Sequence, residues 1–161
     1  MPPPIYSALW PVGRHPATWI DFENRCVTAF PLSRTRQAIA HGLWQMATAL
    51  ATAGIEGDIW VDGSFVTSTI DPNDADVVLS VAGEFYDESP PDRQAAIDWV
   101  STNLKVSHLC DSYLLFRWAE GHPLYWLGES MYAYWMKQWA FDRENNLKGM
   151  PVLQIRGGSI V

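Results

Sequence analysis

Basic residues are scarce in this chain, and their scarcity argues against some classes of function. Lysine and arginine together number 11 against 18 aspartates and glutamates, which gives a formal net charge of −7. The lysines are only Lys105, Lys137 and Lys148. Proteins that bind nucleic acid without sequence preference do so through clustered lysines and arginines. A dedicated nucleic-acid binder is therefore disfavoured, whereas a nucleotide ligand is not.

Long apolar runs and paired cysteines are also missing. No stretch approaches the ~20 apolar residues that span a bilayer, and the opening MPPPIYSALWPVG lacks the basic and apolar regions of a signal peptide. Cys26 and Cys110 match no metal or redox spacing. We expect each to be a small buried thiol in a reducing compartment rather than half of a disulfide. The sequence thus predicts a cytoplasmic protein without a membrane segment.

Aromatic residues, in contrast, are plentiful. Nine tryptophans, six tyrosines and six phenylalanines among 161 residues supply ample area for a core and exclude intrinsic disorder. The length fits one domain. We therefore predict a single domain over residues 1–161, of which 1–18 form a proline-rich N-terminal arm that lies on the domain, since this segment holds five of the 11 prolines.

Helix and strand patterns alternate along the rest of the chain. Thr18, with Asp21 three residues later, predicts the capped start of a short helix. The clearest helix covers residues 33–53, where apolar residues recur at helical spacing: Ile39, Leu43, Met46 and Leu50. Further helices are predicted at 89–104 and 124–141, and strands at 59–64, 74–81, 105–116 and 150–158. The expected fold class is α/β (α+β), a mixed β-sheet flanked by helices.

Two acidic residues follow a glycine–serine turn at the start of the next predicted strand. Asp74 and Asp76 occupy positions i and i+2, so their carboxylates project to the same face and repel each other unless a cation lies between them. Mg²⁺ (or Mn²⁺) suits a few carboxylates together with substrate phosphates. Gly63 lets the backbone approach a polyphosphate, and the Ser64 hydroxyl can donate to it. These are the components of metal-assisted nucleotidyl transfer.

A third carboxylate and a lysine could complete such a site. Asp111 lies in the β-prone run 105–116, after a predicted helix that would let its strand return beside that of Asp76. An acid among apolar neighbours is costly unless it is paired or binds metal, so Asp111 is a candidate metal ligand or base. Lys148 can contact a phosphate as a point charge, or it can end a helix for which Gly149 is the cap.

Other residues have simpler interpretations. Asp62 could join the site, but a structural cap of the turn is favoured. Aromatic residues at 125–139 are interpreted as a core stripe, or as an interaction surface if Trp126 and Tyr134 prove exposed. No P-loop motif occurs, and nothing around Ser64 forms the nucleophile elbow of a serine hydrolase.

The segment Gly63-Ser64, nine residues, Asp74-x-Asp76 resembles the signature of the DNA polymerase β-type nucleotidyltransferase superfamily, particularly its minimal bacterial members. The resemblance implies a nucleotidyltransferase-like fold. It also implies that Gly63 and Ser64 hold a nucleoside triphosphate such as ATP, while Asp74 and Asp76 bind metal. A third acid on a later strand, here Asp111, would complete the site.

The wider layout is similar to an uncharacterised family of small bacterial and phage proteins, over Pro11–Thr18, Trp60–Thr67, Pro72–Asp76 and Phe141–Gly149. The resemblance implies Mg²⁺-dependent transfer of a nucleoside monophosphate to a hydroxyl acceptor in a protein, a small molecule or a tRNA. Some relatives of this kind act in toxin–antitoxin or phage-defence systems. The alternative is a catalytically inactive binding protein, an immunity or antitoxin partner whose negative surface neutralises a basic toxin.

Overall fold

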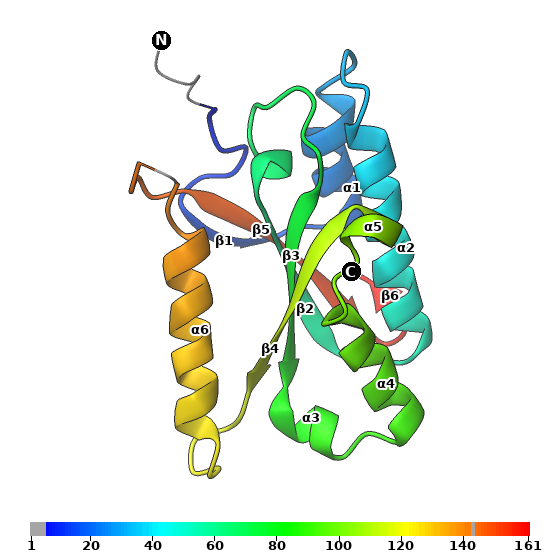
Figure 1. Ribbon diagram of the computed structural model, residues 1–161, viewed down its shortest axis with the longest axis vertical. Helices are drawn as coiled ribbons and strands as arrows, with labels where there is room; N and C mark the ends of the chain where they lie inside the picture. The colour runs from blue at the N-terminus through cyan, green and yellow to red at the C-terminus, as the bar shows by residue number, and fades with distance from the viewer. Residues whose placement is uncertain (1–5, 143) are drawn as a thin grey trace.

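The computed structural model describes residues 6–142 and 144–161, which form a mixed sheet with helices on both faces (Figure 1). The strand order is β1-β5-β2-β3-β4, and β6 pairs with β5. The strands are β1 (Gly13–Pro16), β2 (Gly57–Asp62), β3 (Ala75–Ala82), β4 (Cys110–Arg117), β5 (Gly149–Arg156) and β6 (Ser159–Ile160). The pairs β1·β5 and β3·β4 are parallel, and the other pairs are antiparallel. The predicted fold class is confirmed.

Six α-helices are found among the described residues: α1 (Trp19–Glu23), α2 (Arg36–Thr52), α3 (Gly83–Asp87), α4 (Pro91–Val100), α5 (Lys105–His108) and α6 (Tyr125–Trp139). Thr18 caps α1 as predicted, because its Oγ1 accepts from the Asp21 N–H at 3.2 Å. A π-helical turn, Asn24–Thr28, follows α1, and a 3₁₀ turn covers Ser64–Val66. None of the helices in the described part of the chain is long and apolar enough to cross a membrane.

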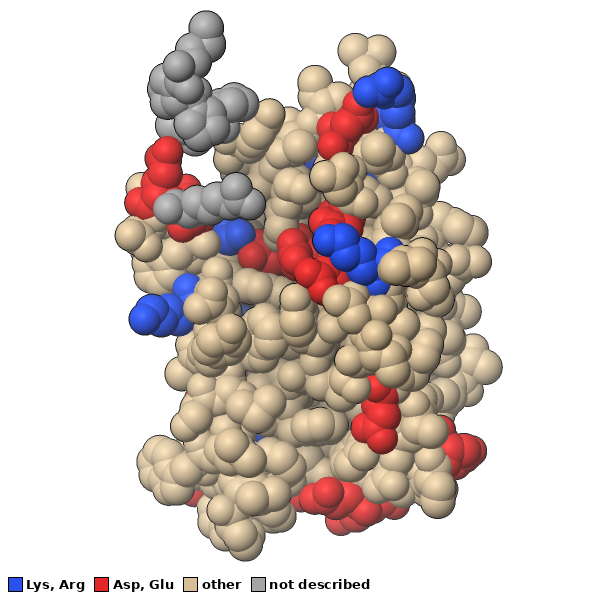
Figure 2. Space-filling view, in the orientation of Figure 1, with Lys and Arg blue, Asp and Glu red and all other residues tan. Residues whose placement is uncertain are grey.

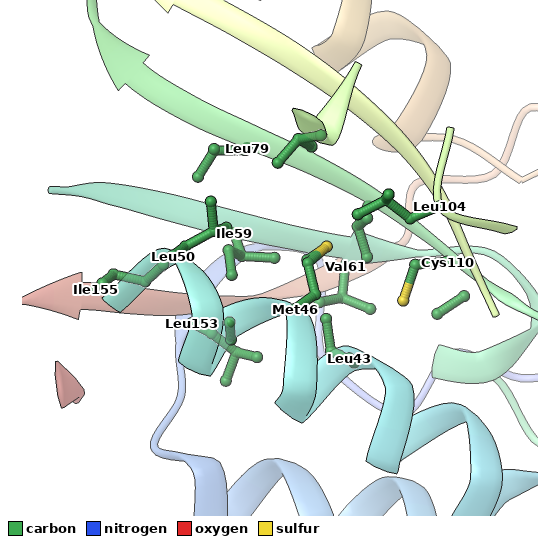
Figure 3. Packing of buried hydrophobic residues seen from close by; sticks show 14 of the residues in the cluster. Leu43, Met46, Leu50, Ile59, Val61, Leu79, Leu104, Cys110, Leu153 and Ile155 are labelled. Atoms are coloured by element: carbon green, nitrogen blue, oxygen red, sulfur yellow. The ribbon is translucent and has the colours of Figure 1, made fainter. Parts of the chain in front are cut away.

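The first face of the sheet is covered by α2. Its predicted apolar stripe is fully buried, and the side chains of Leu43, Met46 and Leu50 point toward those of the sheet (Figure 3). Burial of each such side chain is worth about 1.5–3 kcal/mol. The helix ends where Gly54 adopts a positive φ of 73°. Cys26 and Cys110 belong to the same core and are free thiols, as expected.

The opposite face of the sheet is covered by α6, which lies on the other side of the sheet from α2 and α4 in Figure 1. Trp60 packs edge-on against Tyr132 with ring centroids 5.7 Å apart, and Trp139 is buried beside the strands. The core-stripe interpretation therefore holds for this side of the helix. Trp126 and Tyr134 face away, with 76% and 56% of their surfaces exposed.

Two segments differ from the sequence prediction. Residues 13–16 of the proline-rich arm form β1, in parallel register with β5, so part of the arm is an edge strand of the sheet; residues 1–5 lie outside the described part. Residues 105–108 form α5 instead of a strand, and β4 begins only at Cys110. The flanking Asn103 and Leu109 have positive φ values of 62° and 55°, which set the helical turn apart from the strand.

Candidate functional site

Strand register brings three aspartates into one row. Asp62, at the end of β2, pairs with Asp76 of β3, and Asp76 pairs with Asp111 of β4. Directly paired residues lie on the same face of a sheet, on strands about 4.8 Å apart. Together with Asp74, which immediately precedes β3, we call these four residues the acid row. Figure 2 shows acidic side chains gathered in the middle of this surface, with basic groups beside them.

The orientation of Asp76 follows from strand alternation. Ala75 and Val77 are fully buried in the core on the α2 side, so Asp76 projects to the α6 side. The pKa of Asp76 is raised to about 6. Burial is the largest cause, and the charges of Asp74 and Asp111 contribute the rest of the increase. The strand of Asp111 thus returns beside that of Asp76 as predicted, and these carboxylates are close enough to repel each other.

Gly63 has the backbone conformation that the acid row requires. Its φ is 82°, in the region that favours glycine, and a Cβ added there would overlap with Oδ2 of Asp76. Ser64 follows directly and starts the 3₁₀ turn. The carbonyl of Ser64 accepts a hydrogen bond from the Thr67 N–H at 3.2 Å. The glycine–serine turn therefore lies against the acid row.

Two of the three lysines pair with the acid row. Lys105 Nζ lies 2.6 Å from Asp74 Oδ2. Lys148 Nζ lies 2.7 Å from Asp62 Oδ1 and donates a hydrogen bond to Oδ2 at 2.8 Å. Four carboxylates and two ammonium groups leave a net charge of −2 when all are ionised. That residual charge is the charge that one divalent cation would neutralise.

The predicted site residue Lys148 immediately precedes β5, and its side chain is only 15% exposed. The alternative interpretation of Lys148 and Gly149 as a helix end is wrong. α6 ends at Trp139, and Gly149 is the first residue of β5. Whether Lys148 contacts a phosphate stays a prediction.

The sequence interpretation favoured Asp62 as a structural cap of the turn, whereas the structure places it in the acid row. It is 3% exposed, and its burial raises its pKa to about 6 although Lys148 lowers it. Its Oδ1 is in ion-pair contact with Lys148 but has no hydrogen-bond partner of its own among the described residues. Asp62 shares a strand face with Trp60, which is also buried. The place of Asp62 beside Asp76 comes from cross-strand register, which no local sequence signal indicates.

Asp111 is held by neighbours that are close to it in the sequence. Asn103 Nδ2 donates to Asp111 Oδ1 at 2.9 Å. Burial raises the pKa of Tyr113, and a hydrogen bond to Asp111 raises it further. The Tyr113 ring also lies 4.8 Å from that of Trp135, so α6 borders the acid row on this side.

Carboxylate oxygens are the type of ligand that a hard divalent cation prefers, but the acid row is not arranged as a metal site. No three histidine, cysteine, aspartate or glutamate side chains of residues 6–142 and 144–161 are grouped so that they could hold a metal ion together. Lys105 and Asn103 contact the carboxylates of Asp74 and Asp111 instead. A divalent cation here would have to replace the ammonium of Lys105, and metal binding stays a prediction.

The helix-flanked mixed sheet and its acid row define an α/β protein with an anionic site at one sheet end. The chain belongs to DUF6932, a family of unknown function, whose model matches residues 4–154. No curated protein and no solved structure matches it. The family carries no assigned activity, so the link to nucleotidyltransferases rests on the residues themselves.

Proposed function

We propose that this protein is a Mg²⁺- or Mn²⁺-dependent nucleotidyltransferase that moves a nucleoside monophosphate from a triphosphate to a hydroxyl group. The observation that supports the proposal most strongly is the register of β2, β3 and β4. It aligns Asp62, Asp76 and Asp111 on one face, beside the glycine–serine turn. Sequence spacing alone does not create this alignment.

The residues around the acid row have distinct roles in this proposal. The backbone at Gly63 and the hydroxyl of Ser64 bind the triphosphate, and Lys148 supplies a positive charge to it. Asp74, Asp76 and Asp111 would hold the divalent cation once Lys105 has released Asp74. The cation would supply positive charge for the leaving pyrophosphate and would acidify the attacking hydroxyl. The acceptor oxygen then forms a bond to the α-phosphorus as the bond to pyrophosphate breaks, and Asp111 accepts the hydroxyl proton.

The acceptor is a hydroxyl of a small molecule, a protein or a tRNA. The net charge of −7 favours a small molecule or a protein over a large RNA, since phosphates would be repelled by this surface.

The proposal is tested with ATP, GTP, CTP and UTP, each labelled at the α-phosphate, with and without Mg²⁺ or Mn²⁺. We expect metal-dependent binding of at least one triphosphate and transfer of its label. Asp76→Asn should lower transfer by about 100-fold or more, as loss of a charge-stabilising group does. The matched control is Asp92→Asn, in the first turn of α4, which should leave transfer unchanged. Failure of every triphosphate to bind would reject the proposal.

The lysine–aspartate pairs favour a second candidate, a binding protein of the same fold without transferase activity. In that case Lys105 and Lys148 neutralise the acid row for structural reasons, and the protein acts through a partner such as a basic toxin. The double variant Asp74→Asn/Asp76→Asn separates the two functions. A biological effect that survives this change supports the binding protein, and a lost effect supports the enzyme.

A further inference from the structure

A cavity of about 520 Å³ lies at the other end of the sheet from the acid row. It is open to solvent and is lined by the start of β2, the ends of β3 and β4, and the first turns of α6. β3 runs from Asp76 at the acid row to Ala82 at the cavity. Six residues of extended strand separate them by ~20 Å, so the cavity is a separate feature.

The cavity has an excess of negative charge. Four carboxylates line it, from Glu56, Asp58, Glu84 and Glu129, against two arginines. Each arginine is already paired with one of these acids at 2.6 Å: Arg156 with Asp58 and Arg117 with Glu129. The lining therefore carries a net charge of −2.

In the described part of the chain, the remaining two acids accept hydrogen bonds from backbone donors, and His122 is close enough to Glu84 to help lower its pKa. Glu56 accepts from the N–H of Gly157 at 2.9 Å, and Glu84 accepts from the N–H of Ala119 at 2.8 Å. No lysine or arginine among the described lining residues neutralises either of them. A cationic group that entered the cavity would meet two carboxylates with remaining acceptor capacity and an aromatic wall that includes Tyr125.

An exposed apolar patch borders the cavity at the start of α6. It consists of Leu124, Trp126 and Leu127, which are 41%, 76% and 52% exposed. The Trp126 ring lies 5.0 Å from that of Tyr125, so the patch is continuous with the cavity wall. A small cation held in the cavity would leave this patch in water. A larger ligand that carries both a positive charge and apolar groups would cover both features.

We propose that this end of the molecule binds a basic amphipathic helix of a partner protein. A lysine or arginine of the partner would enter the cavity toward Glu56 and Glu84, and its apolar face would pack on Trp126 and Leu127. Charge complementarity selects this occupant, because like-charged surfaces oppose association. A second copy of this chain would bring the same negative charge to the contact. The interaction is independent of the proposed transferase activity.

The test uses a fluorescein-labelled amphipathic peptide of lysine and leucine, with a glutamate–leucine peptide of the same pattern as its counterpart. Fluorescence anisotropy is expected to show binding of the basic peptide only. Trp126→Ser/Leu127→Ser should weaken it by about tenfold or more, as loss of an aromatic hot spot does. Glu56→Gln/Glu84→Gln, which keeps acceptors for the backbone N–H groups, should weaken it several-fold and reduce its salt dependence.

The matched controls lie away from this end of the sheet. Ile20→Ser removes an apolar side chain on α1 that is 70% exposed, and Glu23→Gln removes an exposed charge on the same helix; both should keep the affinity within about twofold. Thermal unfolding verifies that each variant is folded. Equal weakening by patch and control variants, or equal binding of the acidic peptide, would overturn the proposal. So would a dimer that Trp126→Ser dissociates, since the patch would then bind a second copy.

Discussion

Gly63 combines an unusual backbone angle with a close approach to Asp76, and the two effects can be separated. Any other residue in place of Gly63 would be strained by the positive φ of 82°, and its Cβ would displace the Asp76 carboxylate. Gly121 also has a positive φ, 89°, but nothing lies within 4 Å of its hypothetical Cβ. A substitution at Gly121 therefore measures the destabilisation caused by the backbone angle alone.

We predict that Gly121→Ala lowers the free energy of unfolding by about 1–2 kcal/mol and that Gly63→Ala lowers it by more. Gly63→Ala should also weaken any divalent-cation binding, because the acid row must rearrange. Urea unfolding and isothermal titration with Mn²⁺ measure the two effects. Equal destabilisation with unchanged Mn²⁺ affinity would show that Gly63 has no role beyond its backbone angle.

Asp76 makes stability depend on pH. Burial and the neighbouring carboxylates raise its pKa to about 6 in the folded protein, above the ~3.9 of an unfolded aspartate. Between these values the folded state binds more protons than the unfolded state. The contribution of Asp76 to the free energy of unfolding therefore falls as the pH rises from about 4 through 6.

Asp76→Asn removes this buried charge while preserving the shape of the side chain. In the presence of a chelator we expect the variant to be more stable than the wild type at pH 8, by about 1–2 kcal/mol after allowance for its partial exposure. The difference should disappear near pH 4. Urea unfolding across this pH range measures it, with Asp92→Asn on α4 as the matched control. A variant that is less stable at pH 8 would contradict the prediction.

At the scale of elements, one buried arginine joins α2 to the loop that follows the glycine–serine turn. Arg36 is fully buried, and its guanidinium donates to the carbonyls of Cys26, Phe65 and Thr67 at 2.8, 2.6 and 2.7 Å, and also to that of Thr69. No carboxylate is among these acceptors, so Arg36 serves as a backbone anchor. It holds the connection between β2 and β3, and hence the spacing of Gly63 from Asp76.

We expect Arg36→Met to lower the free energy of unfolding by about 3 kcal/mol or more, because several buried carbonyls lose their donor. Arg36→Lys should recover part of the loss. The matched control is Arg34→Met: Arg34 is paired with Asp71, but its side chain is 87% exposed, so the change should cost less than about 1 kcal/mol. Similar losses at both positions in chemical denaturation would contradict the anchoring role.

Local periodicity explains which elements the sequence could predict. α2 has an uninterrupted apolar stripe, and β3 is rich in β-branched residues, so both could be recognised from their own residues. β1 could not, because a strand of four residues that includes Pro16 forms only through pairing with the distant β5. α5 could not either, since the positive φ of Asn103 and Leu109 is a tertiary outcome.

The candidate site divides in the same way. Strand alternation predicts that Asp74 and Asp76 project to the same face. The helix predicted between the two strands lets the strand of Asp111 lie beside that of Asp76. The contacts of Lys105 and Lys148, and the burial of Asp62, depend on cross-strand register and on loops distant in sequence. Register is not encoded in any short segment, so these contacts were not predictable.

For the molecule as a whole, the acid row predicts a measurable response to divalent cations. At 100 times its dissociation constant, a cation that binds only the folded state adds about 2.7 kcal/mol of stability, or about 5–10 °C in the unfolding midpoint for a chain of this size. Mg²⁺ or Mn²⁺ should produce such a shift at constant ionic strength. Asp76→Asn should abolish it, and Asp92→Asn should preserve it. An identical shift in both variants would place cation binding elsewhere.

The position of β5 has a consequence for how the chain is made. β5 lies between β1 and β2 in the sheet, yet it is translated about 90 residues after β2 and more than 130 after β1. On the ribosome, β1 and the β5-facing edge of β2 must wait without their hydrogen-bonding partner until Gly149–Arg156 emerge. Strands that pair across such long separations fold slowly. Nascent chains arrested before residue 149 should therefore expose an open sheet edge and depend on chaperones to stay free of aggregation.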